Sequence, residues 1–432
     1  CMILGKHTGQ IYEKFAGGFC KANLALGASI GIQLTMLPVS LYFFGEVSLV
    51  GIFLNLLVLP TVGIVLGSGV TGLLAGCVSF SVGRVVILPG KVLAGIYEEL
   101  CKLSGNLPFG IWITGQPKLW QVAAYYILFA GAVWILTQKG KRERKIIAFV
   151  VVCLAMSILI WREPEPFSVS CLDVGQGDCF FFRDGNGKNY LIDGGSSSVD
   201  AVGRYRLEPF LKFRGVKRLD YVWVTHGDVD HLNAVEELLE RRKYGVEIQY
   251  LIFPEQKYWD ERLIKLCNLA EEAGTKVRVM EMDTIFLSGK LKMRCLWPGE
   301  GEPSENGNEN SLVLHLQYEK ITMLFTGDLE NTGEELLAER IKNLRKKGEL
   351  PACYDLLKVG HHGSRNATGE ELLEVIRPRA AFCSSGKENR YGHPHAETLE
   401  RLAKWGVSLY NTKDRGAVSM YTDGREYGIQ SP

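Results

Sequence analysis

The stretch THGDVDH, residues 225–231, decides the fold of the C-terminal part of this 432-residue chain. It follows a hydrophobic run over 221–224 and precedes an apolar-periodic segment from Val235, so we expect a strand, a tight turn and a helix. Imidazole and carboxylate groups at such a turn suit a divalent metal ion, whereas a solvated turn or helix cap explains one aspartate at best. The candidate ligands are His226, Asp228, Asp230 and His231.

Two further strand ends carry ligand types. FTGD ends at Asp328, and LLKVGHHGS, residues 356–364, contains His361 and His362. Since one of two adjacent histidines usually points away from what the other binds, we expect one ligand from this pair. Together with the first stretch, these residues supply a set for two metal ions that share a carboxylate. Later, His393 in YGHPH is a proton donor or substrate clamp, or equally a surface turn residue.

Two glycine-rich turns precede the histidine stretch. LDVGQGD, residues 172–178, has Asp173, Gln176 and Asp178 as polar tips, and by itself it resembles a hairpin with permissive glycines. LIDGG contains Asp193, which we interpret as support for a ligand more than as a ligand. The eleven cysteines form no CxxC pair, so a zinc-finger spacing is excluded.

Short strands and periodic helices alternate from residue 167 onward, which predicts an α/β layered domain over 167–432. The expected strands are 167–174, 179–183, 189–192, 221–225, 311–318, 322–326 and 355–359. The expected helices are 235–242, 259–273, 332–345, 369–376 and 395–405.

The N-terminal part, residues 1–166, has the composition of a membrane segment. Residues 22–83 contain a single charged residue, Glu46, which excludes a wholly soluble chain. The chain opens with Cys1, not Met, so we expect a fragment of a longer protein. We expect spans at 24–44, 119–137 and 146–161, a re-entrant segment and a span over 47–83 with an interruption at Pro60, and an interfacial segment over 84–118.

The loop at 139–145 carries the orientation signal. Its five cationic residues place it in the cytoplasm by the positive-inside bias, so the C-terminal domain is expected on the extracytoplasmic face of the cell membrane. Residues up to 166 carry 13 Lys and Arg against 7 Asp and Glu, while the remainder carries 36 against 41. The two parts therefore carry net charges of +6 and −5.

The motifs DVGQGD, LIDGG, THGDVDH, NSLVL, FTGD, LKVGHHGS and YGHPH, in this order, resemble the metallo-β-lactamase-type domain of the ComEC DNA-uptake proteins. The membrane part, with QLTMLPVSLYFFG at 33–45, resembles the end of their competence domain. The resemblance implies a multi-pass α-helical membrane segment followed by a four-layer αββα domain. It covers essentially the whole chain, although the family has an earlier soluble region and more spans.

For function, the resemblance implies a channel that passes one DNA strand and a metal-dependent nuclease that degrades the other. The implied partners are DNA, the lipid bilayer, a DNA receptor and a cytoplasmic translocase, and a homo-oligomer is left open. By motif, His226 and Asp228 would hold one metal ion and Asp230, His231 and His361 or His362 the other, with Asp328 as the bridge.

This chain departs from the superfamily pattern HxHxDH. Asp228 stands where a histidine is usual, and Asn310 stands where the pattern has the histidine ahead of the bridging aspartate, with His315 as a poor substitute. Fewer imidazoles favour Mn²⁺ or Mg²⁺ over Zn²⁺ and leave one or two ions open. The candidate catalytic residues and phosphate contacts are Asp230, His231, Lys358, Ser364, Arg365, Arg390 and His393.

Two alternatives remain at this level. In the first, the metallohydrolase-like domain would be catalytically weak and would only bind or gate DNA at the channel, as the lost imidazoles would allow. In the second, it would hydrolyse a smaller phosphodiester or ester. Metal-dependent DNA cleavage distinguishes both alternatives from the nuclease.

Overall fold

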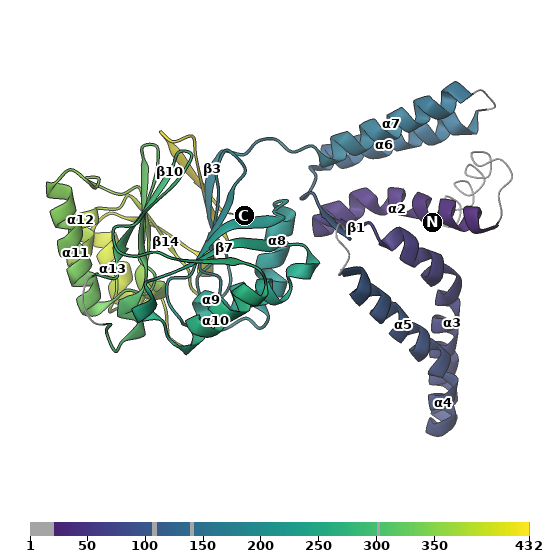
Figure 1. The fold of residues 1–432 in the computed structure, drawn as a ribbon, viewed down its shortest axis with the longest axis horizontal. Coiled ribbons are helices and arrows are strands. Elements are labelled where there is room, and N and C mark those ends of the chain that lie inside the picture. Colours follow the sequence, from purple (N-terminus) through teal and green to yellow (C-terminus); the bar gives the residue numbers. More distant parts are fainter. Residues whose placement is uncertain (1–20, 106–109, 139–141, 300–302, 432) are drawn as a thin grey trace. The chain divides into compact units, whose positions relative to one another are not determined.

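A computed structural model describes residues 21–105, 110–138, 142–299 and 303–431 of the chain (Figure 1). The chain divides into two compact units. The first contains the described residues up to Arg162, together with Lys212–Val216 and Lys243–Gly245. The second contains Glu163–Leu211, Lys217–Arg242 and the residues from Val246 onward.

The first unit is built of apolar helices, two of which, α6 and α7, pack along each other (Figure 1). The Tyr125 hydroxyl of α6 donates to the Leu34 carbonyl of α2 over 2.8 Å, and the Gln121 amide of α6 donates to the Ile158 carbonyl of α7 over 2.6 Å. The elements are α2 (Lys21–Phe44), β1 (Glu46–Ser48), α3 (Gly51–Val78), α4 (Phe80–Val86), α5 (Leu88–Gly105), β2 (Ile111–Ile113), α6 (Leu119–Thr137) and α7 (Arg142–Ile160).

Three helical stretches among the described residues are long and apolar enough to cross a membrane: Gly27–Phe44, Phe53–Val78 and Leu119–Thr137. The pair Phe80–Val86 and Leu88–Ser104, bent by 46°, adds a fourth candidate as a broken span or a re-entrant loop. The interfacial position expected for residues 84–118 stays a prediction.

The expected interruption at Pro60 is wrong. α3 continues through Pro60 to Val78, and the chain bends after Ser79 instead. Proline is tolerated inside membrane helices because neighbouring polar groups satisfy the backbone that it disturbs.

The span expected at 146–161 is not among the stretches that pass the test of length and composition. Every 18-residue window of α7 contains Glu143, Arg144 and Lys145. The uncharged remainder, Ile146 to Ile160, rises about 22 Å, less than the roughly 30 Å hydrocarbon core. Residues 139–141 of the orientation loop lie outside the described residues. The side of the membrane that the second unit occupies therefore stays a prediction.

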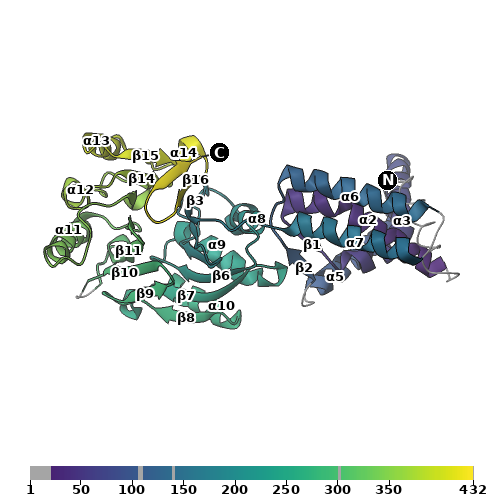
Figure 2. The ribbon, with the colours of Figure 1, turned by 90° about the horizontal axis from the view of Figure 1, so that it is seen from above.

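The second unit is a four-layer α/β sandwich, as expected (Figure 2). Its eight-stranded sheet has the order β17-β16-β3-β4-β5-β6-β7-β8, and its seven-stranded sheet has the order β15-β14-β13-β12-β11-β10-β9. The first sheet contains β3 (Phe167–Cys171), β4 (Phe180–Arg183), β5 (Asn189–Ile192), β6 (Arg218–Trp223), β7 (Glu247–Phe253), β8 (Lys276–Val279), β16 (Val418–Thr422) and β17 (Tyr427–Gln430). The second contains β9 (Ile285–Ser288), β10 (Leu291–Trp297), β11 (Val313–Tyr318), β12 (Ile321–Phe325), β13 (Leu356–Lys358), β14 (Ala380–Cys383) and β15 (Ser408–Asn411).

The apolar core lies between the two sheets. Phe180 and Phe182 of β4 meet Phe325 of β12 edge-on, with ring centroids 5.3 and 5.2 Å apart. A second core lies between the seven-stranded sheet and the outer helices, where Leu337 of α11 and Leu357 of β13 are both fully buried. Each sheet thus has one face on the other sheet and one face under helices.

Helices cover both outer faces. α9 contacts β7 and α10 contacts β8, while α11 contacts β10 and α13 contacts β15 on the opposite side (Figure 2). The helices are α8 (Glu208–Phe213), α9 (Val229–Glu240), α10 (Glu261–Glu272), α11 (Asn331–Lys346), α12 (Glu370–Ile376), α13 (Ala396–Lys404) and α14 (Thr412–Arg415).

α9 begins six residues earlier than expected, at Val229 instead of Val235. Asp228 occupies its N-cap position in an extended conformation, but its side chain makes no capping hydrogen bond. Asp230 and His231 therefore lie in the first helical turn. The helix, and not a flexible loop, sets the direction of these two side chains.

Candidate metal centre

Strand ends of both sheets bring polar side chains to one place. His226 follows β6 and His231 begins α9, whereas Asp328 follows β12 and His362 follows β13. Strands β5 to β7 are parallel, as are β12 to β14. Because the carboxyl ends of parallel strands share one sheet edge, their loops meet there. We call His226, His231, Asp328 and His362 the inner set; all four are buried.

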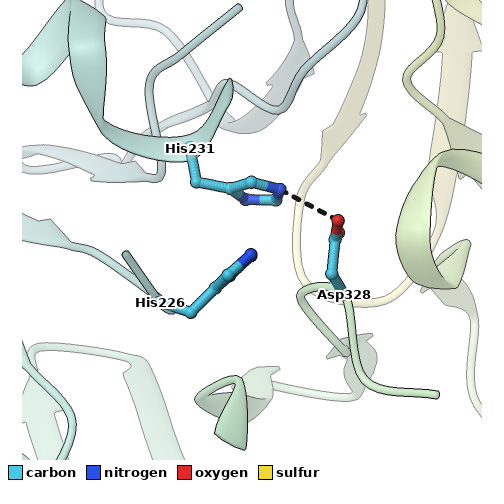
Figure 3. A group of neighbouring side chains, drawn as sticks. All are labelled: His226, His231 and Asp328. Carbon is cyan, nitrogen blue, oxygen red and sulfur yellow. Dashed lines mark ion pairs between the residues drawn. The ribbon is translucent and has the colours of Figure 1, made fainter. Parts of the chain in front are cut away.

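Two histidines of the inner set converge on one carboxylate oxygen, and the third packs beside them. Nε2 of His231 lies 3.2 Å from Oδ2 of Asp328, and Figure 3 shows this ring directed at the carboxylate. Nε2 of His362 lies 3.4 Å from the same oxygen. His226 packs on His231 with ring centroids 4.2 Å apart, and ligand atoms of His226, His231 and Asp328 lie within 4.8 Å of one another.

Asp193 holds His231 from behind. Its Oδ2 lies 2.9 Å from Nδ1 of His231, and its carboxylate accepts hydrogen bonds from the backbone N–H and the hydroxyl of Thr225 over 2.7 and 2.8 Å. A carboxylate on the far nitrogen fixes the tautomer of a ligand histidine and leaves Nε2 for the metal. Asp193 therefore has the supporting position that its motif suggested.

The other two inner histidines are held in the same way. Nδ1 of His226 lies 3.0 Å from Oγ1 of Thr225, and Nδ1 of His362 lies 3.1 Å from the Ser384 carbonyl. The Nε2 atoms of His226, His231 and His362 are buried, and none has hydrogen-bond geometry with a described residue. Buried polar atoms are otherwise nearly always paired. These orphaned nitrogens fit a metal ion.

The remaining predicted ligands, Asp228, Asp230 and His361, form an outer set that is more exposed. Oδ2 of Asp230 lies 3.6 Å from Nε2 of His362, with 19% of its side chain exposed. Asp228 is 50% exposed, and its carboxylate is shared between Nε2 of His226 at 3.8 Å and the Arg262 guanidinium at 3.3 Å. The outer set lies at the rim of the centre.

Both adjacent histidines face the centre, contrary to the expectation that one points away. His361 and His362 adopt left-handed backbone conformations with φ of 43° and 52°. Such a conformation is unfavourable for side chains other than glycine, and two in succession turn both rings to the same side. Nε2 of His361 lies 3.7 Å from Oδ2 of Asp328, while Glu330 holds its Nδ1 at 2.9 Å.

Lys358 does not lie where a phosphate contact would. It is 2% exposed, and its ammonium lies 2.6 Å from Oδ2 of Asp178 and 3.2 Å from Oδ1 of Asp328. It also donates to the Gly327 carbonyl over 2.5 Å. Burial opposes its charge, but the carboxylates of Asp178 and Asp328 outweigh burial and raise the pKa of Lys358. The ammonium therefore has two hydrogen bonds and a close ion pair inside the protein.

Asp178 lies beneath the metal centre, although its motif suggested only the polar tip of a turn. It is fully buried, and its Oδ1 lies 3.3 Å from Nδ1 of His362. Gly177 has φ of +152°, and a Cβ there would lie 2.3 Å from the Gly195 carbonyl and 2.7 Å from the Asp230 carbonyl. The glycines of both turns therefore permit the close approach that brings Asp178 under α9.

His393 lies beside the centre with a defined orientation. Nε2 of Gln176 lies 3.3 Å from Nδ1 of His393, and the Gly386 backbone N–H donates to Oε1 of the same Gln176 over 3.3 Å. The amide NH₂ therefore faces the imidazole, so Nδ1 accepts and Nε2 carries the ring proton. Burial, and then the nearby His362 and His361, lower the pKa of His393 to about 4.

Neither residue considered for the missing histidine reaches the centre. His315 packs edge-on against Tyr354 in the core under the helices, and burial lowers its pKa to about 4. Asn310 forms hydrogen bonds with the backbone of Ser304 and so stabilises its own loop. Residues 300–302 of this loop lie outside the described residues. Asn308 lies closer, since its amide is 3.5 Å from Nδ1 of His361.

The predicted phosphate contacts near the histidines differ in accessibility. Ser364 is buried, and its hydroxyl accepts from the Asn366 N–H. Arg365 is exposed and lies 3.3 Å from Glu397, and the exposed Arg390 guanidinium lies 4.9 Å from the Tyr391 ring centroid. Of this group, the two arginines remain available at the surface.

The carboxylates, imidazoles and ammonium of the centre shift one another's pKa values. Burial opposes ionisation of Asp328, but His231, His362 and Lys358 outweigh it and hold the pKa of this carboxyl well below its usual range. Burial likewise opposes protonation of His231, yet Asp328 and Asp193 raise its pKa well above the ordinary value. In the metal-free protein, protons on the imidazoles thus supply the positive charge that the carboxylates attract.

Comparison with known families agrees with this architecture. Residues 172–387, half of the chain, match the model of the metallo-β-lactamase superfamily, and the chain belongs to that superfamily. Residues 6–139 match a second model, described as Competence protein. The resemblance drawn from the motifs is therefore confirmed for both parts, and the family match together with the apolar helices marks the chain as a membrane protein.

Curated relatives match across both parts. The chain is 28% identical over 411 residues to ComE operon protein 3 of Bacillus subtilis, with 90% of this chain and 50% of the relative covered. It is 26% identical over 424 residues to Recombination protein 2 of Haemophilus influenzae, with 90% and 48% covered. The chain spans about half the length of these relatives. The chain is also similar to a solved structure, the metallo-β-lactamase fold protein YhfI of Bacillus subtilis, which covers 57% of this chain and is itself 96% covered, at 13% identity and a TM-score of 0.39.

Proposed function

We propose that the second unit is a metal-dependent phosphodiesterase that cleaves DNA, and that the chain takes part in DNA internalisation during natural transformation. The inner set is the observation that supports the chemistry: three histidines have buried Nε2 atoms without hydrogen bonds, and two of these atoms lie within 3.4 Å of one oxygen of Asp328. The competence-protein match supports the process.

The inner set would hold the metal ion through Nε2 of His226, His231 and His362 and through Asp328. Mg²⁺ prefers oxygen ligands, whereas imidazole suits zinc and other transition metals. His361 adds a fourth imidazole at the rim. This nitrogen-rich set removes the reason to favour Mg²⁺, and we propose Mn²⁺ or Zn²⁺. When bound, such an ion lowers the pKa of a water molecule and offsets charge on phosphodiester oxygens.

The residues of the chain supply orientation and hydrogen bonds. Asp193 keeps Nε2 of His231 toward the centre, and Asp230 lies at the rim, where it orients the attacking water. His393 is neutral near pH 7 and presents an Nε2–H whose tautomer is set by Gln176. Because an imidazole with this pKa is a poor acid at neutral pH, we assign His393 as a clamp that donates to a phosphate oxygen.

DNA would be the substrate, delivered by the membrane part. A net charge of −5 argues against binding by bulk charge, so the exposed Arg365 and Arg390 and the metal centre carry the phosphate contacts. We further propose that the second unit lies on the extracytoplasmic face, that the first unit contributes to a DNA channel, and that a DNA receptor and a cytoplasmic translocase act with it.

The test is DNA cleavage by the full chain in detergent micelles with Mn²⁺ or Zn²⁺. We expect cleavage that is lost in Asp328→Asn and kept in Glu339→Gln, a matched carboxylate change on an exposed position of α11. If folded, metal-loaded protein binds DNA without cleaving it, the domain binds or gates DNA and is not a nuclease. If a small diester is hydrolysed and DNA neither binds nor competes, the substrate assignment fails.

A further inference from the structure

Asp328 presents its two carboxylate oxygens to different neighbours. Oδ2 faces Nε2 of His231 at 3.2 Å and Nε2 of His362 at 3.4 Å. Oδ1 faces the ammonium of Lys358 at 3.2 Å. In a centre with two metal ions, a shared carboxylate helps to hold ions about 3.5–4 Å apart. Here the second oxygen of Asp328 is engaged by an ammonium group of the chain itself.

The other acceptors around that ammonium belong to the same buried pocket. Lys358 lies 2.6 Å from Oδ2 of Asp178 and donates to the Gly327 carbonyl over 2.5 Å. Both Lys358 and Asp178 are almost fully buried, at 2% and 0% side-chain exposure. A lysine ammonium with two hydrogen bonds and a close ion pair in a buried pocket occupies a defined position between the two carboxylates.

The groups of potential metal ligands among the described residues also involve the carboxylates that contact Lys358. Three groups of potential ligands have atoms within 4.8 Å of one another. One combines His226 and His231 with Asp328. The other two each depend on Asp178, the carboxylate closest to Lys358. An ion in either of those two groups would therefore compete with the lysine for its acceptor.

Within the outer set, Asp228 offers little to a second ion. Asp228, which stands where the superfamily pattern has histidine, is half-exposed and lies 3.3 Å from the Arg262 guanidinium. Its contact with Nε2 of His226 is 3.8 Å. A carboxylate that is hydrated and paired with arginine is a weaker anchor than a buried imidazole.

We propose that the centre holds one divalent ion per chain, and that Lys358 takes the place of a second ion between Asp178 and Asp328. This inference rests on the metal centre of the proposed function and gives its stoichiometry. Lys358 is then a positioning residue, because it neutralises and orients the carboxylate that the metal uses. A single ion leaves substrate orientation to the chain, in agreement with the fixed tautomer of His393.

The test is to count ions in the full chain. Protein in detergent micelles is loaded with Mn²⁺ and dialysed, and its metal content is measured by mass spectrometry. We expect one Mn²⁺ per chain and the electron paramagnetic resonance spectrum of an isolated Mn²⁺ ion, with binding lost in His231→Ala. Two ions per chain, the spectrum of a spin-coupled pair, or no retained ion would each overturn the inference. DNA cleavage is assayed separately, so a failure of the nuclease assignment leaves the count unaffected.

A variant sharpens the role of the lysine. Lys358→Ser vacates the position between the two carboxylates, and we expect the count to rise from one to two at millimolar Mn²⁺. The control Lys404→Ser, at an exposed lysine that pairs with Glu370, should remain at one. A folded Lys358→Ser protein that still holds one ion contradicts the substitution of lysine for metal. If this variant does not fold, the count and the spectrum of the unmodified chain still decide.

Discussion

The inner set and the outer set differ in burial and in what holds them. His231 and His362 are at most 1% exposed, and each has a fixed partner on Nδ1. In contrast, 50% of the Asp228 side chain is exposed, and its partner is the exposed Arg262 guanidinium. Burial with a second polar layer preorganises a ligand, and exposure leaves it hydrated. The comparison indicates that the inner set binds the metal while the outer set meets water and substrate.

The largest effect is expected from breaking the inner set. His231→Ala should weaken Mn²⁺ binding by more than about 100-fold, beyond the range expected of a supporting residue, and abolish cleavage. The loss also removes one of the three hydrogen-bond partners of the buried Asp193. Calorimetric titration with Mn²⁺ measures the affinity. The control His395→Ala, at the start of α13, should bind normally; comparable affinities in the two variants would contradict the assignment.

His393 separates substrate contact from metal binding. His393→Ala should lower DNA cleavage by about 100-fold, the loss expected for one fixed hydrogen-bond donor, with Mn²⁺ affinity unchanged. Gln176→Met should give a smaller loss of the same kind, because the ring stays while its tautomer is released. Steady-state cleavage and metal titration are measured on the same preparations. A parallel loss of metal binding would place His393 among the ligands instead.

The inner set also predicts a pH dependence of metal affinity. In the metal-free protein burial opposes the charge on His362, but Asp328 and Asp178 raise its pKa to about 10. A metal ion must displace this proton and the proton of His231, whose pKa is also raised, so Mn²⁺ affinity should rise by at least about tenfold per pH unit between pH 7 and 9. Competition with a chelator of known affinity measures it. An affinity independent of pH would show that His362 binds no metal.

The same shift sets the stability of the metal-free protein. The folded pKa of His362 is about 10, above the roughly 6.5 of an unfolded chain. Its protonation therefore stabilises the fold fully below pH 6.5, and this contribution is lost as the pH rises through about 10. Chelated protein should melt at lower temperature at pH 9.5 than at pH 7, and Mn²⁺ should restore part of the difference.

The smallest effect is expected at the rim. Asp228→Asn should change Mn²⁺ affinity by less than about tenfold and the free energy of unfolding by less than about 1 kcal/mol, since the pair with Arg262 is exposed on both sides. Titration and denaturant unfolding measure the two quantities. An effect as large as that of His231→Ala would erase the distinction between the two sets and favour a second bound ion.

Much of the fold could be predicted from local pattern. Strands at 189–192 and helices at 332–345 and 369–376 were expected within one residue of their observed bounds. The predicted helix bounds were wrong where local sequence preferences are weak. Pro60 does not interrupt α3, and α9 starts six residues before its apolar periodicity, because Asp228 takes the N-cap position ahead of a polar first turn.

The sequence by itself determined the residue types of the centre and the strand ends that carry them. The tertiary structure decided their roles. Two successive left-handed residues turn both His361 and His362 inward, and a segment far away in sequence brings Asp178 under Lys358. A motif specifies its own turn and its own donors. The partner of each donor depends on which strands are neighbours across two packed sheets. Only the packing of the folded core sets the distance between a donor and its partner.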